Sequence, residues 1–284
     1  MAGTLFVVAT PIGNLEDISA RALRILREVT LVAAEDTRRT GQLLQHFGLT
    51  TRTISFHEHS EKGKAADLVA RLLAGESIAL VSDAGTPVVS DPGAHLIRLA
   101  HEAGVRVEPI PGANAVVAAL SGSGFGADGF VFLGFPPSKG SDRGAWFARL
   151  RAASGVVPVA VFYEAPHRIE ETLAELRRVL GDVRVCVARE LTKAHEELRV
   201  CRLSELKLSQ IRGEFTIAVE FGETTEHTAT VAPLSAADAA VEFGDLTNKE
   251  GMTRRQAIST LSRRHRIPAK RIFDLLEEAK NSVV

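Results

Sequence analysis

Two carboxylates, Asp83 and Asp91, stand in a loop that is rich in glycine, proline and serine and runs from residue 82 to 93. An apolar run at residues 78–81 precedes the loop and predicts a buried strand, and the residues after it predict a helix over 95–100. In α/β proteins, ligands bind in the crevice at the carboxyl ends of the strands. The spacing therefore predicts a binding loop in which the two carboxylates supply hydrogen-bond acceptors.

Gly85 and Gly93 allow the backbone of this loop to approach a ligand closely, while Pro87 and Pro92 stiffen it. The same residues also fit an ordinary turn with aspartate caps, because Asp-Pro-Gly and Gly-Thr-Pro are common turn sequences. The length of the loop favours a functional role, since two rigid turns with two carboxylates exceed what a strand-to-helix connection needs.

Further polar residues gather where predicted strands end. Taken alone, each fits the role of a helix cap or a surface pair. As a set they favour a site, because they follow strands rather than precede them. They are Asn14, Glu35, Asp36, Arg38, His57, His59, Asn114, Glu164, His167, Arg168, Glu190 and Lys193.

The sequence lacks the patterns of several other chemistries. It contains no Gly-x-Gly-x-x-Gly with a following ribose-binding acid, no Walker A loop and no Gly-x-Ser-x-Gly nucleophile turn. NAD, nucleoside triphosphate and serine hydrolase chemistry therefore have no support. His57 and His59 could hold a metal, but two histidines without a clear third ligand make a weak metal site. We expect no metal.

Strands and helices are expected to alternate along the chain, which predicts a parallel sheet with ligands at one edge. The expected strands cover residues 4–9, 31–34, 53–56, 78–81, 105–110, 130–135, 156–163, 183–188, 198–203 and 215–221. The expected helices cover residues 20–29 behind a Ser19 cap, 40–47, 65–73, 95–100, 116–120, 143–153 and 169–180. Residues 121–129 and 224–235 are expected to be linkers.

The last part of the chain differs from the rest. Helices are expected at residues 238–243, 253–262 and 269–279, and every charged side chain between Arg254 and Arg271 is basic. Two short helices joined by a turn, with clustered Arg and Lys, are typical of a helix-turn-helix-like module that contacts phosphates. A solvated helical cap or a dimerisation element is the alternative. The local basic cluster favours nucleic acid, because the rest of the chain is acidic.

The bulk composition bounds the class of protein. The 284 residues, 45% hydrophobic and 24% charged, predict a soluble globular protein of one large or two modest domains. The formal net charge of −1 gives no global affinity for nucleic acid. Cys186 and Cys201 lack metal or redox spacing. The run at residues 4–9 fits a strand and neither a leader nor a membrane span, so we expect a cytoplasmic protein.

Seven motifs, in order between about residues 4 and 221, resemble the ribosomal RNA small subunit methyltransferase I family, which is similar in fold to the tetrapyrrole methylases. They are Thr10-Pro11-Ile12-Gly13-Asn14-Leu15, Ala34-Glu35-Asp36-Thr37-Arg38, residues 82–93, Pro111-Gly112-Ala113-Asn114-Ala115, Tyr163-Glu164-Ala165-Pro166-His167-Arg168, Arg189-Glu190-Leu191-Thr192-Lys193 and Gly213-Glu214-Phe215. The basic tail resembles the C-terminal domain of that family. Ala165, where the family commonly has serine, and Pro136 depart from the pattern.

The resemblance implies an α/β protein with the two-domain, tetrapyrrole-methylase-like (class III methyltransferase) fold and a small C-terminal helical domain. We place the domains at residues 1–121, 122–224 and 236–284. The resemblance also implies an enzyme that transfers a methyl group from S-adenosylmethionine, bound between the two α/β domains, to the ribose 2′-hydroxyl of a cytidine in the decoding region of small-subunit (16S) rRNA. The implied partners are that rRNA, or the assembled small ribosomal subunit, and a second copy in a homodimer, with no membrane.

The matching motifs also imply site residues. Cofactor contacts would come from Asp83, Ala84, Gly85, Thr86, Pro87, Ala113, Ala115, Leu191, Glu214, Phe215 and Thr216. RNA contacts would come from Arg38, His167, Arg168, Arg254, Arg255, Arg263, Arg264 and Arg271. Positioning dominates a displacement at a sulfonium methyl, and a base near the ribose hydroxyl would assist it. The candidate catalytic residues are Glu164, Glu190, Asp36 and Lys193.

Two other functions remain open. One is methylation of a small tetrapyrrole, which the basic tail argues against, because a small-molecule enzyme does not need that cluster. The other is a non-catalytic protein of ribosome assembly, which would bind RNA and not S-adenosylmethionine.

Overall fold

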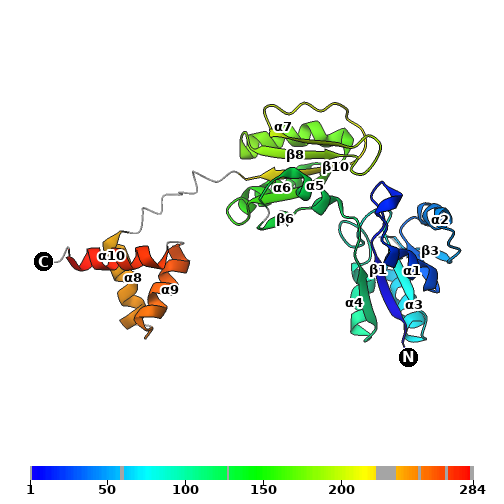
Figure 1. Ribbon diagram of the computed structural model, residues 1–284, viewed down its shortest axis with the longest axis horizontal. Helices are drawn as coiled ribbons and strands as arrows, with labels where there is room; N and C mark the ends of the chain where they lie inside the picture. The colour runs from blue at the N-terminus through cyan, green and yellow to red at the C-terminus, as the bar shows by residue number, and fades with distance from the viewer. Residues whose placement is uncertain are drawn as a thin grey trace. The chain divides into compact units, whose positions relative to one another are not determined.

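The computed structural model describes residues 2–57, 61–126, 128–221, 235–248, 251–265 and 268–281, without the side chains of residues 61, 62, 263, 264, 280 and 281. The chain forms two compact units, Met1–Glu223 and Thr224–Val284. Figure 1 labels their elements. The expected linker at residues 224–235 lies outside the described residues except at Ser235. His59 also lies outside the described residues.

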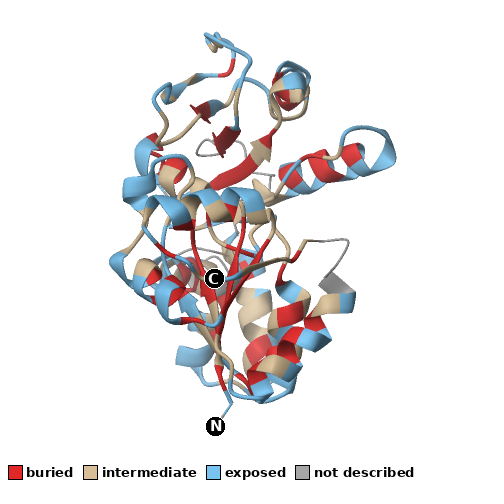
Figure 2. Cartoon of the chain, turned by 90° about the vertical axis from the view of Figure 1, so that its right-hand side faces the viewer, coloured by how far each residue is buried: buried red, intermediate tan, exposed pale blue. Residues whose placement is uncertain are grey.

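The first sheet of the larger unit is parallel, as predicted, with the strand order β3-β2-β4-β1-β5. Its strands are β1 (Thr4–Val8), β2 (Leu31–Ala34), β3 (Thr53–Ser55), β4 (Ile78–Val81) and β5 (Arg106–Ile110). Every residue of β2 and β4 is buried, because helices cover both faces of the sheet. Figure 2 shows buried strands flanked by helices whose outer faces are exposed.

Alternate residues of these strands enter two separate cores. Leu31 and Leu80 pack in the core of one face, and Val32 and Val81 pack in the core of the other. The surrounding helices are α1 (Ala20–Glu28), α2 (Thr37–His46), α3 (Glu61–Leu73) and α4 (Ala94–Glu102). The Ser19 hydroxyl accepts a hydrogen bond from the Ala22 amide at 3.0 Å, which confirms the predicted cap of α1.

Helix α2 begins three residues earlier than the sequence analysis predicted, at Thr37. The Asp36 carboxylate accepts a hydrogen bond from the Arg38 amide at 2.8 Å and so caps the helix. Arg38 and Arg39 are therefore helical residues and not part of the loop before the helix.

The second sheet is mixed, with the order β6-β7-β10-β8-β9. Its strands are β6 (Phe130–Phe132), β7 (Val159–Glu164), β8 (Arg184–Arg189), β9 (Glu197–Arg202) and β10 (Phe215–Glu220). β6 runs parallel to β7, whereas β10 is antiparallel to both β7 and β8, and β8 is antiparallel to β9. The last strand of this sheet in the sequence thus lies at its centre.

Helices α6 (Gly140–Ala153) and α7 (Ile169–Leu180) pack against one face of the second sheet, and α5 (Ala115–Ser123) packs against the other. Val116 and Leu120 of α5 lie in one core with Val161 of β7 and Ala218 of β10. The expected linker from residue 121 is wrong over its first part, because α5 continues to Ser123 and ends at Gly124, whose φ is 69°.

The expected strand at residues 130–135 is also shorter than predicted and ends at Phe132. The domain limits at residues 121 and 122 stay a prediction, although such a limit would separate most of α5 from the sheet that it covers.

The smaller unit contains the helices α8 (Ala236–Asn248), α9 (Arg254–His265) and α10 (Ala269–Asn281) among its described residues. Ala239 and Leu246 of α8 share a core with Leu261 of α9 and Leu276 of α10. Helix α8 is longer than predicted and packs on both other helices. The unit is therefore a small three-helix body with a core of its own.

Candidate functional site

A cavity of about 340 Å³ lies between the loops of the two sheets of the larger unit. From the first sheet it is lined by Ile12, Glu35, Arg39, Asp83, Ala84, Gly85, Thr86, Val89, Ser90, Asp91, Asn114 and Ala115. From the second sheet it is lined by Phe135, Tyr163, Glu164, Ala165, Pro166, Glu214, Phe215 and Thr216. The first set follows the carboxyl ends of β1, β2, β4 and β5, which is where α/β sheets bind ligands. We call this cavity the central pocket.

The loop after β4 has an unusual backbone. Val88 and Ser90 have φ values of 77° and 65°, in the left-handed region that side chains other than glycine rarely adopt. For the β-branched Val88 this conformation is strained, and such strain concentrates at binding sites. A short bridge to Thr10 fixes the loop at Gly85, where the two backbones exchange hydrogen bonds of 2.8 and 3.0 Å.

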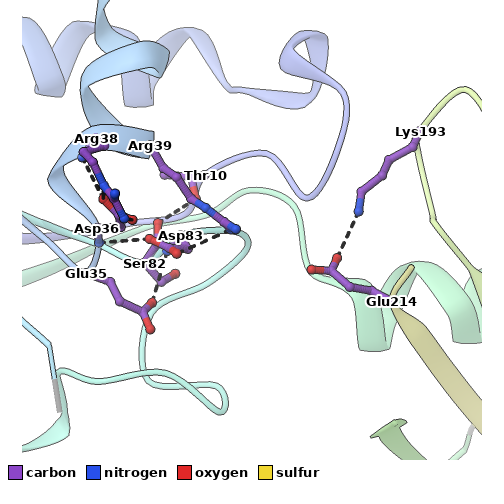
Figure 3. Close-up of polar contacts among 9 residues, drawn as sticks. All are labelled: Thr10, Glu35, Asp36, Arg38, Arg39, Ser82, Asp83, Lys193 and Glu214. Atoms are coloured by element: carbon purple, nitrogen blue, oxygen red, sulfur yellow. Dashed lines mark hydrogen bonds and ion pairs between the residues drawn. The ribbon is translucent and has the colours of Figure 1, made fainter. Parts of the chain in front are cut away.

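Two carboxylates join the loops that follow β2 and β4. The Asp36 amide donates to Oδ1 of Asp83 at 2.9 Å, and the Asp83 amide donates to Oε2 of Glu35 at 3.2 Å. An Arg39 guanidinium nitrogen lies 3.4 Å from Oδ2 of Asp83. Figure 3 shows Arg39 extended toward Asp83 while Arg38 folds back onto Asp36. The pairing holds both loops at the edge of the central pocket.

Asp91, in the lining of the pocket, has a pKa suited to proton transfer near neutral pH. Burial and the charge of Glu35 raise its pKa from 3.8 to about 6, with a smaller contribution from Asp83 and partial opposition from the Ser82 hydroxyl. Asp91 was predicted as a hydrogen-bond acceptor and not as a candidate base. The signal available in the sequence was the second carboxylate of the loop.

Tyr163 lies where the two sides of the pocket meet. Burial and the carboxylates of Asp91 and Glu214 raise its pKa to about 12, so its hydroxyl stays protonated at neutral pH. Tyr163 was not among the predicted site residues, and Glu35 was predicted only as one of the polar residues at strand ends, since each needs the fold to bring it beside the loop after β4.

Glu164 lines the pocket but its carboxylate is fully enclosed by other partners. Its side chain is 0% exposed and lies 2.6 Å from an Arg168 guanidinium nitrogen. It also accepts hydrogen bonds from the Thr172 hydroxyl at 2.6 Å and from the Ala165 amide at 2.7 Å. Arg168 in turn donates to the Pro136 carbonyl at 3.0 Å. These contacts favour a structural role for the pair, although the predicted catalytic and RNA-binding roles remain untested.

Glu190 and Lys193 form a network with Glu214 beside the pocket. The Lys193 ammonium lies 2.8 Å from Glu190 and 3.1 Å from Glu214, and the Glu214 amide donates to Glu190 at 2.9 Å. Burial alone would raise the pKa of Glu190, but the hydrogen bonds from Lys193 and Glu214 lower it overall. Figure 3 shows Lys193 directed at Glu214. A low pKa makes Glu190 a weak base.

Asp36 is similarly occupied. Hydrogen bonds from the Arg38 side chain and amide lower its pKa to about 2. As the cap of α2, it has little capacity to accept a proton near neutral pH. Of the four predicted catalytic residues, the central pocket contains Glu164 in its lining and not Asp36, Glu190 or Lys193.

The fold brings most of the predicted cofactor contacts together in the lining of the central pocket. Those that line the central pocket are Asp83, Ala84, Gly85, Thr86, Ala115, Glu214, Phe215 and Thr216. Pro87, Ala113 and Leu191 are not part of the lining, although the Ala113 carbonyl accepts a hydrogen bond from the Thr86 hydroxyl at 3.2 Å. Their roles as cofactor contacts stay predictions.

The predicted RNA contacts fall in several places. His167 and Arg168 belong to a short 3-10 helix, Pro166–Arg168, beside the pocket. In the smaller unit Arg254 and Arg255 line an open groove of about 490 Å³. Arg263 and Arg264 lie in α9, but their side chains are outside the described residues.

Acidic side chains of α10 pair with two of these arginines. Arg254 lies 3.0 Å from Glu277 and stacks over Phe273, and Arg271 lies 3.1 Å from Glu278. The unit is therefore less basic than the run of arginines alone indicates. Within the described residues, no cluster of three or more His, Cys, Asp or Glu side chains could hold a metal ion. No helix in that part of the chain has the length and apolar character needed to cross a membrane.

Comparison with known proteins gives a consistent family. The sequence profile of the Tetrapyrrole (Corrin/Porphyrin) Methylases matches residues 4–207. A protein of Pseudomonas aeruginosa named Ribosomal RNA small subunit methyltransferase I is 51% identical over 225 residues, which cover 77% of this chain and 79% of the relative. The protein of the same name from Synechocystis is 42% identical over 278 residues, which cover 96% of this chain and 97% of the relative.

Solved structures share the fold at lower sequence identity. The uroporphyrin-III C-methyltransferase of Thermus thermophilus, complexed with S-adenosylhomocysteine, has a TM-score of 0.54 and 20% identity and covers 77% of this chain and 98% of its own. The methyltransferase CobJ has a TM-score of 0.58 and 22% identity and covers 77% and 94%. These likenesses establish the α/β fold with two sheets. With the relatives above, they show that the chain belongs to the ribosomal RNA small subunit methyltransferase I family, a family of methyltransferases within the tetrapyrrole methylases.

Proposed function

We propose that this protein transfers a methyl group from S-adenosylmethionine to the ribose 2′-hydroxyl of a cytidine in the decoding region of small-subunit rRNA. The observation that carries the proposal is the central pocket, in which the loop Asp83–Thr86 faces residues Glu214–Thr216 of the other sheet. The names of the relatives support an rRNA substrate. The cytidine and the 2′ position rest on the family resemblance.

The residues of the pocket fit S-adenosylmethionine. The volume of about 340 Å³ lies within the range of about 300–1,000 Å³ that is usual for small-molecule sites. Ile12, Phe135 and Phe215 provide apolar surface, while Glu35 and Asp91 add negative charge. When bound, the cofactor supplies a reactive methyl group on a positively charged sulfur, and carboxylates in a partly buried site favour such a charge.

Asp91 lines the central pocket and is our preferred proton acceptor for the ribose hydroxyl. With a pKa of about 6 it is ionised at neutral pH, yet more basic than an ordinary aspartate. Asp36 and Glu190 have lowered pKa values, and Glu164 is enclosed by Arg168 and Thr172. We therefore add Asp91 to the candidate bases and rank it above those three.

The deciding experiment offers labelled S-adenosylmethionine with isolated small ribosomal subunits or with naked rRNA and maps the product by ribose-resolved mass spectrometry. A 2′-O-methylcytidine supports the proposal, and the better of the two substrates tells whether the assembled subunit is required. Cofactor binding without an RNA product would instead point to a small tetrapyrrole substrate. Absence of both cofactor binding and product would leave a fold without the proposed activity.

A second measurement tests the charge of the pocket without methyl transfer. Calorimetry compares the affinity for S-adenosylmethionine with that for S-adenosylhomocysteine, whose sulfur is neutral. We expect D91N to lower the preference for the charged ligand, and R27Q, an exposed change on α1, to leave it as in the wild type. An unchanged preference in D91N would show that Asp91 does not face the sulfur.

We also propose a homodimer and a cytoplasmic location, both of which follow from the family resemblance. Light scattering behind size-exclusion chromatography measures the mass in solution, and a mass of a single chain of 30.5 kDa would contradict the dimer. Fractionation of cells that express a tagged chain tests the location.

A further inference from the structure

A second cavity of about 330 Å³ adjoins the central pocket in the larger unit. It lies between helix α2 and the loops that follow β1 and β4, and its lining includes Thr10, Pro11, Arg39, Gln42 and His46. Arg39 and Asp83 line both cavities. The second cavity is therefore separated from the proposed site by these two shared side chains, and we call it the α2 cavity.

One face of α2 supplies the polar wall of the α2 cavity. Arg39, Gln42 and His46 are spaced by three and four residues, so their side chains lie along the same side of the helix. The three residues are all exposed or partly exposed. A guanidinium, an amide and an imidazole thus line a space large enough for a small ligand.

Arg39 differs from its neighbour Arg38 in how it is held. Arg38 donates through two nitrogens to the Asp36 carboxylate, at 3.2 and 2.9 Å, and its side chain is 87% exposed. Arg39 lies 3.4 Å from Asp83, which is longer than a normal hydrogen bond. Because a guanidinium has five N–H donors, Arg39 retains donors for a ligand in the cavity.

These groups suit a nucleotide. Arginine presents a planar fork that binds phosphate oxygens through two parallel hydrogen bonds, and glutamine can bond to a base edge or a ribose hydroxyl. The cavity shares its wall with the central pocket, so a bound nucleotide would lie beside whatever ligand enters that pocket. Successive nucleotides of an RNA strand lie side by side in this way, so one could occupy the α2 cavity while its neighbour enters the central pocket.

We propose that the α2 cavity is a subsite for a nucleotide of the RNA strand next to the one that is methylated, with Arg39 holding its phosphate. The inference rests on the proposed rRNA substrate. It assigns the RNA contact near the pocket to Arg39 more than to Arg38, which is tied to Asp36.

The test measures RNA binding directly, by fluorescence anisotropy of a labelled single-stranded RNA that carries the decoding-region sequence, at several salt concentrations. For the full-length R39Q variant we expect about tenfold weaker binding and a salt slope reduced by about one, as for the loss of one phosphate contact. R38Q should lose less affinity than R39Q. R27Q on α1 serves as the matched control and should bind as the wild type does.

A second pair of variants probes the helix face. Q42A removes a group that lines the α2 cavity, whereas Q45A changes the same residue type on another face of α2. We expect weaker RNA binding for Q42A alone. Thermal unfolding of each variant checks that the fold is intact. We expect no loss of fold, because all the positions are solvent-accessible.

Several outcomes would overturn the subsite. Equal losses for R39Q and R38Q, or an unchanged salt slope for R39Q, would remove Arg39 from the RNA contact. Cytidine monophosphate binding as tightly as the RNA would assign the cavity to a free nucleotide. A loss of S-adenosylmethionine affinity in R39Q equal to its loss of RNA affinity would assign Arg39 to the cofactor. RNA binding that depends on Arg39 supports the subsite even if no methylated product forms, so the subsite and the proposed reaction fail separately.

Discussion

The two sheets contribute carboxylates to the central pocket in different ways. On the side of the parallel sheet, Glu35 and Asp83 accept hydrogen bonds from backbone amides, and burial together with the charges of these two groups raises the pKa of Asp91. On the side of the mixed sheet, Glu164 pairs with Arg168 and Glu214 pairs with Lys193.

This difference indicates that the two sides of the pocket have different roles. Amides hold a carboxylate in place without removing its net charge, and Arg39 reaches Asp83 only at 3.4 Å, so the parallel-sheet side keeps negative potential, chiefly from Glu35 and Asp91. Arginine and lysine neutralise a carboxylate, so the mixed-sheet side provides a rigid wall. We infer that charge-dependent binding belongs to the first side and structural support to the second.

The largest effect that would test this division is expected for R168M. It leaves the Glu164 carboxylate buried without its cation, which in proteins typically costs about 3 kcal/mol or more of unfolding free energy. Urea denaturation measures the loss. The control R24M breaks an exposed pair with Glu28 and should cost less than about 0.5 kcal/mol. A loss below about 1 kcal/mol for R168M would show that Glu164 does not depend on neutralisation.

The packing of the mixed-sheet wall is tested by G213A. A Cβ at Gly213 would lie 2.3 Å from Oε1 of Glu190, and the residue has a φ of 80°. We expect a loss of about 2–3 kcal/mol, from backbone strain and from the displaced Glu190 side chain. Gly124 has a φ of 69° and open space around its Cβ, so G124A measures the strain alone, about 1 kcal/mol. Equal losses would mean that the contact with Glu190 is unimportant.

On the parallel-sheet side, D91N should stabilise the protein at pH 7.5. The native pKa of about 6 exceeds the ordinary value of 3.8, so the favourable contribution of Asp91 is complete below pH 3.8 and is lost as the pH rises to about 6. Above that range the ionised Asp91 lowers the free energy of unfolding by about 1 kcal/mol, after allowance for its partial exposure.

Urea midpoints of D91N and the wild type at pH 5 and 7.5 measure this effect. The advantage of D91N should grow between the two pH values as Asp91 ionises. An advantage that is the same at both values, or none at pH 7.5, would contradict the negative potential assigned to this side.

The smallest effect on stability is expected for R271M in the three-helix unit. The pair of Arg271 and Glu278 is neutral like those of the mixed-sheet wall, but both side chains are 54% exposed. Its loss should therefore change the unfolding free energy by less than about 0.5 kcal/mol. RNA affinity should fall all the same if Arg271 contacts phosphates, and a salt titration of binding measures this. A large loss of unfolding free energy in R271M would show that an exposed ion pair stabilises the fold as a buried one does.

The sequence predicts most elements and the main binding loop, because these depend on local patterns. The apolar run of β4 and the Ser19 cap are examples, and so is the loop with Asp83 and Asp91. The start of α2 is harder to predict, since Asp36 could cap a helix or act at a site. That choice decides which way Arg38 and Arg39 point.

Properties that depend on residues far apart in the chain could not be predicted from the sequence. The raised pKa of Asp91 depends on its burial and on Glu35, and the enclosure of Glu164 depends on Arg168 and Thr172. The same is true of strand order. Antiparallel partners such as β7, β8 and β10 carry no periodic signal that says which strand lies between the others.

The central place of β10 determines when the molecule can be completed during its synthesis. The first sheet has all its strands once Ile110 has been made, and it can fold while the ribosome still adds residues. The second sheet cannot join β7 to β8 until residues 215–220 arrive between them. The same segment carries Phe215 and Thr216 of the pocket wall. A nascent chain that stops before β10 would therefore fold in part and still be unable to hold a ligand.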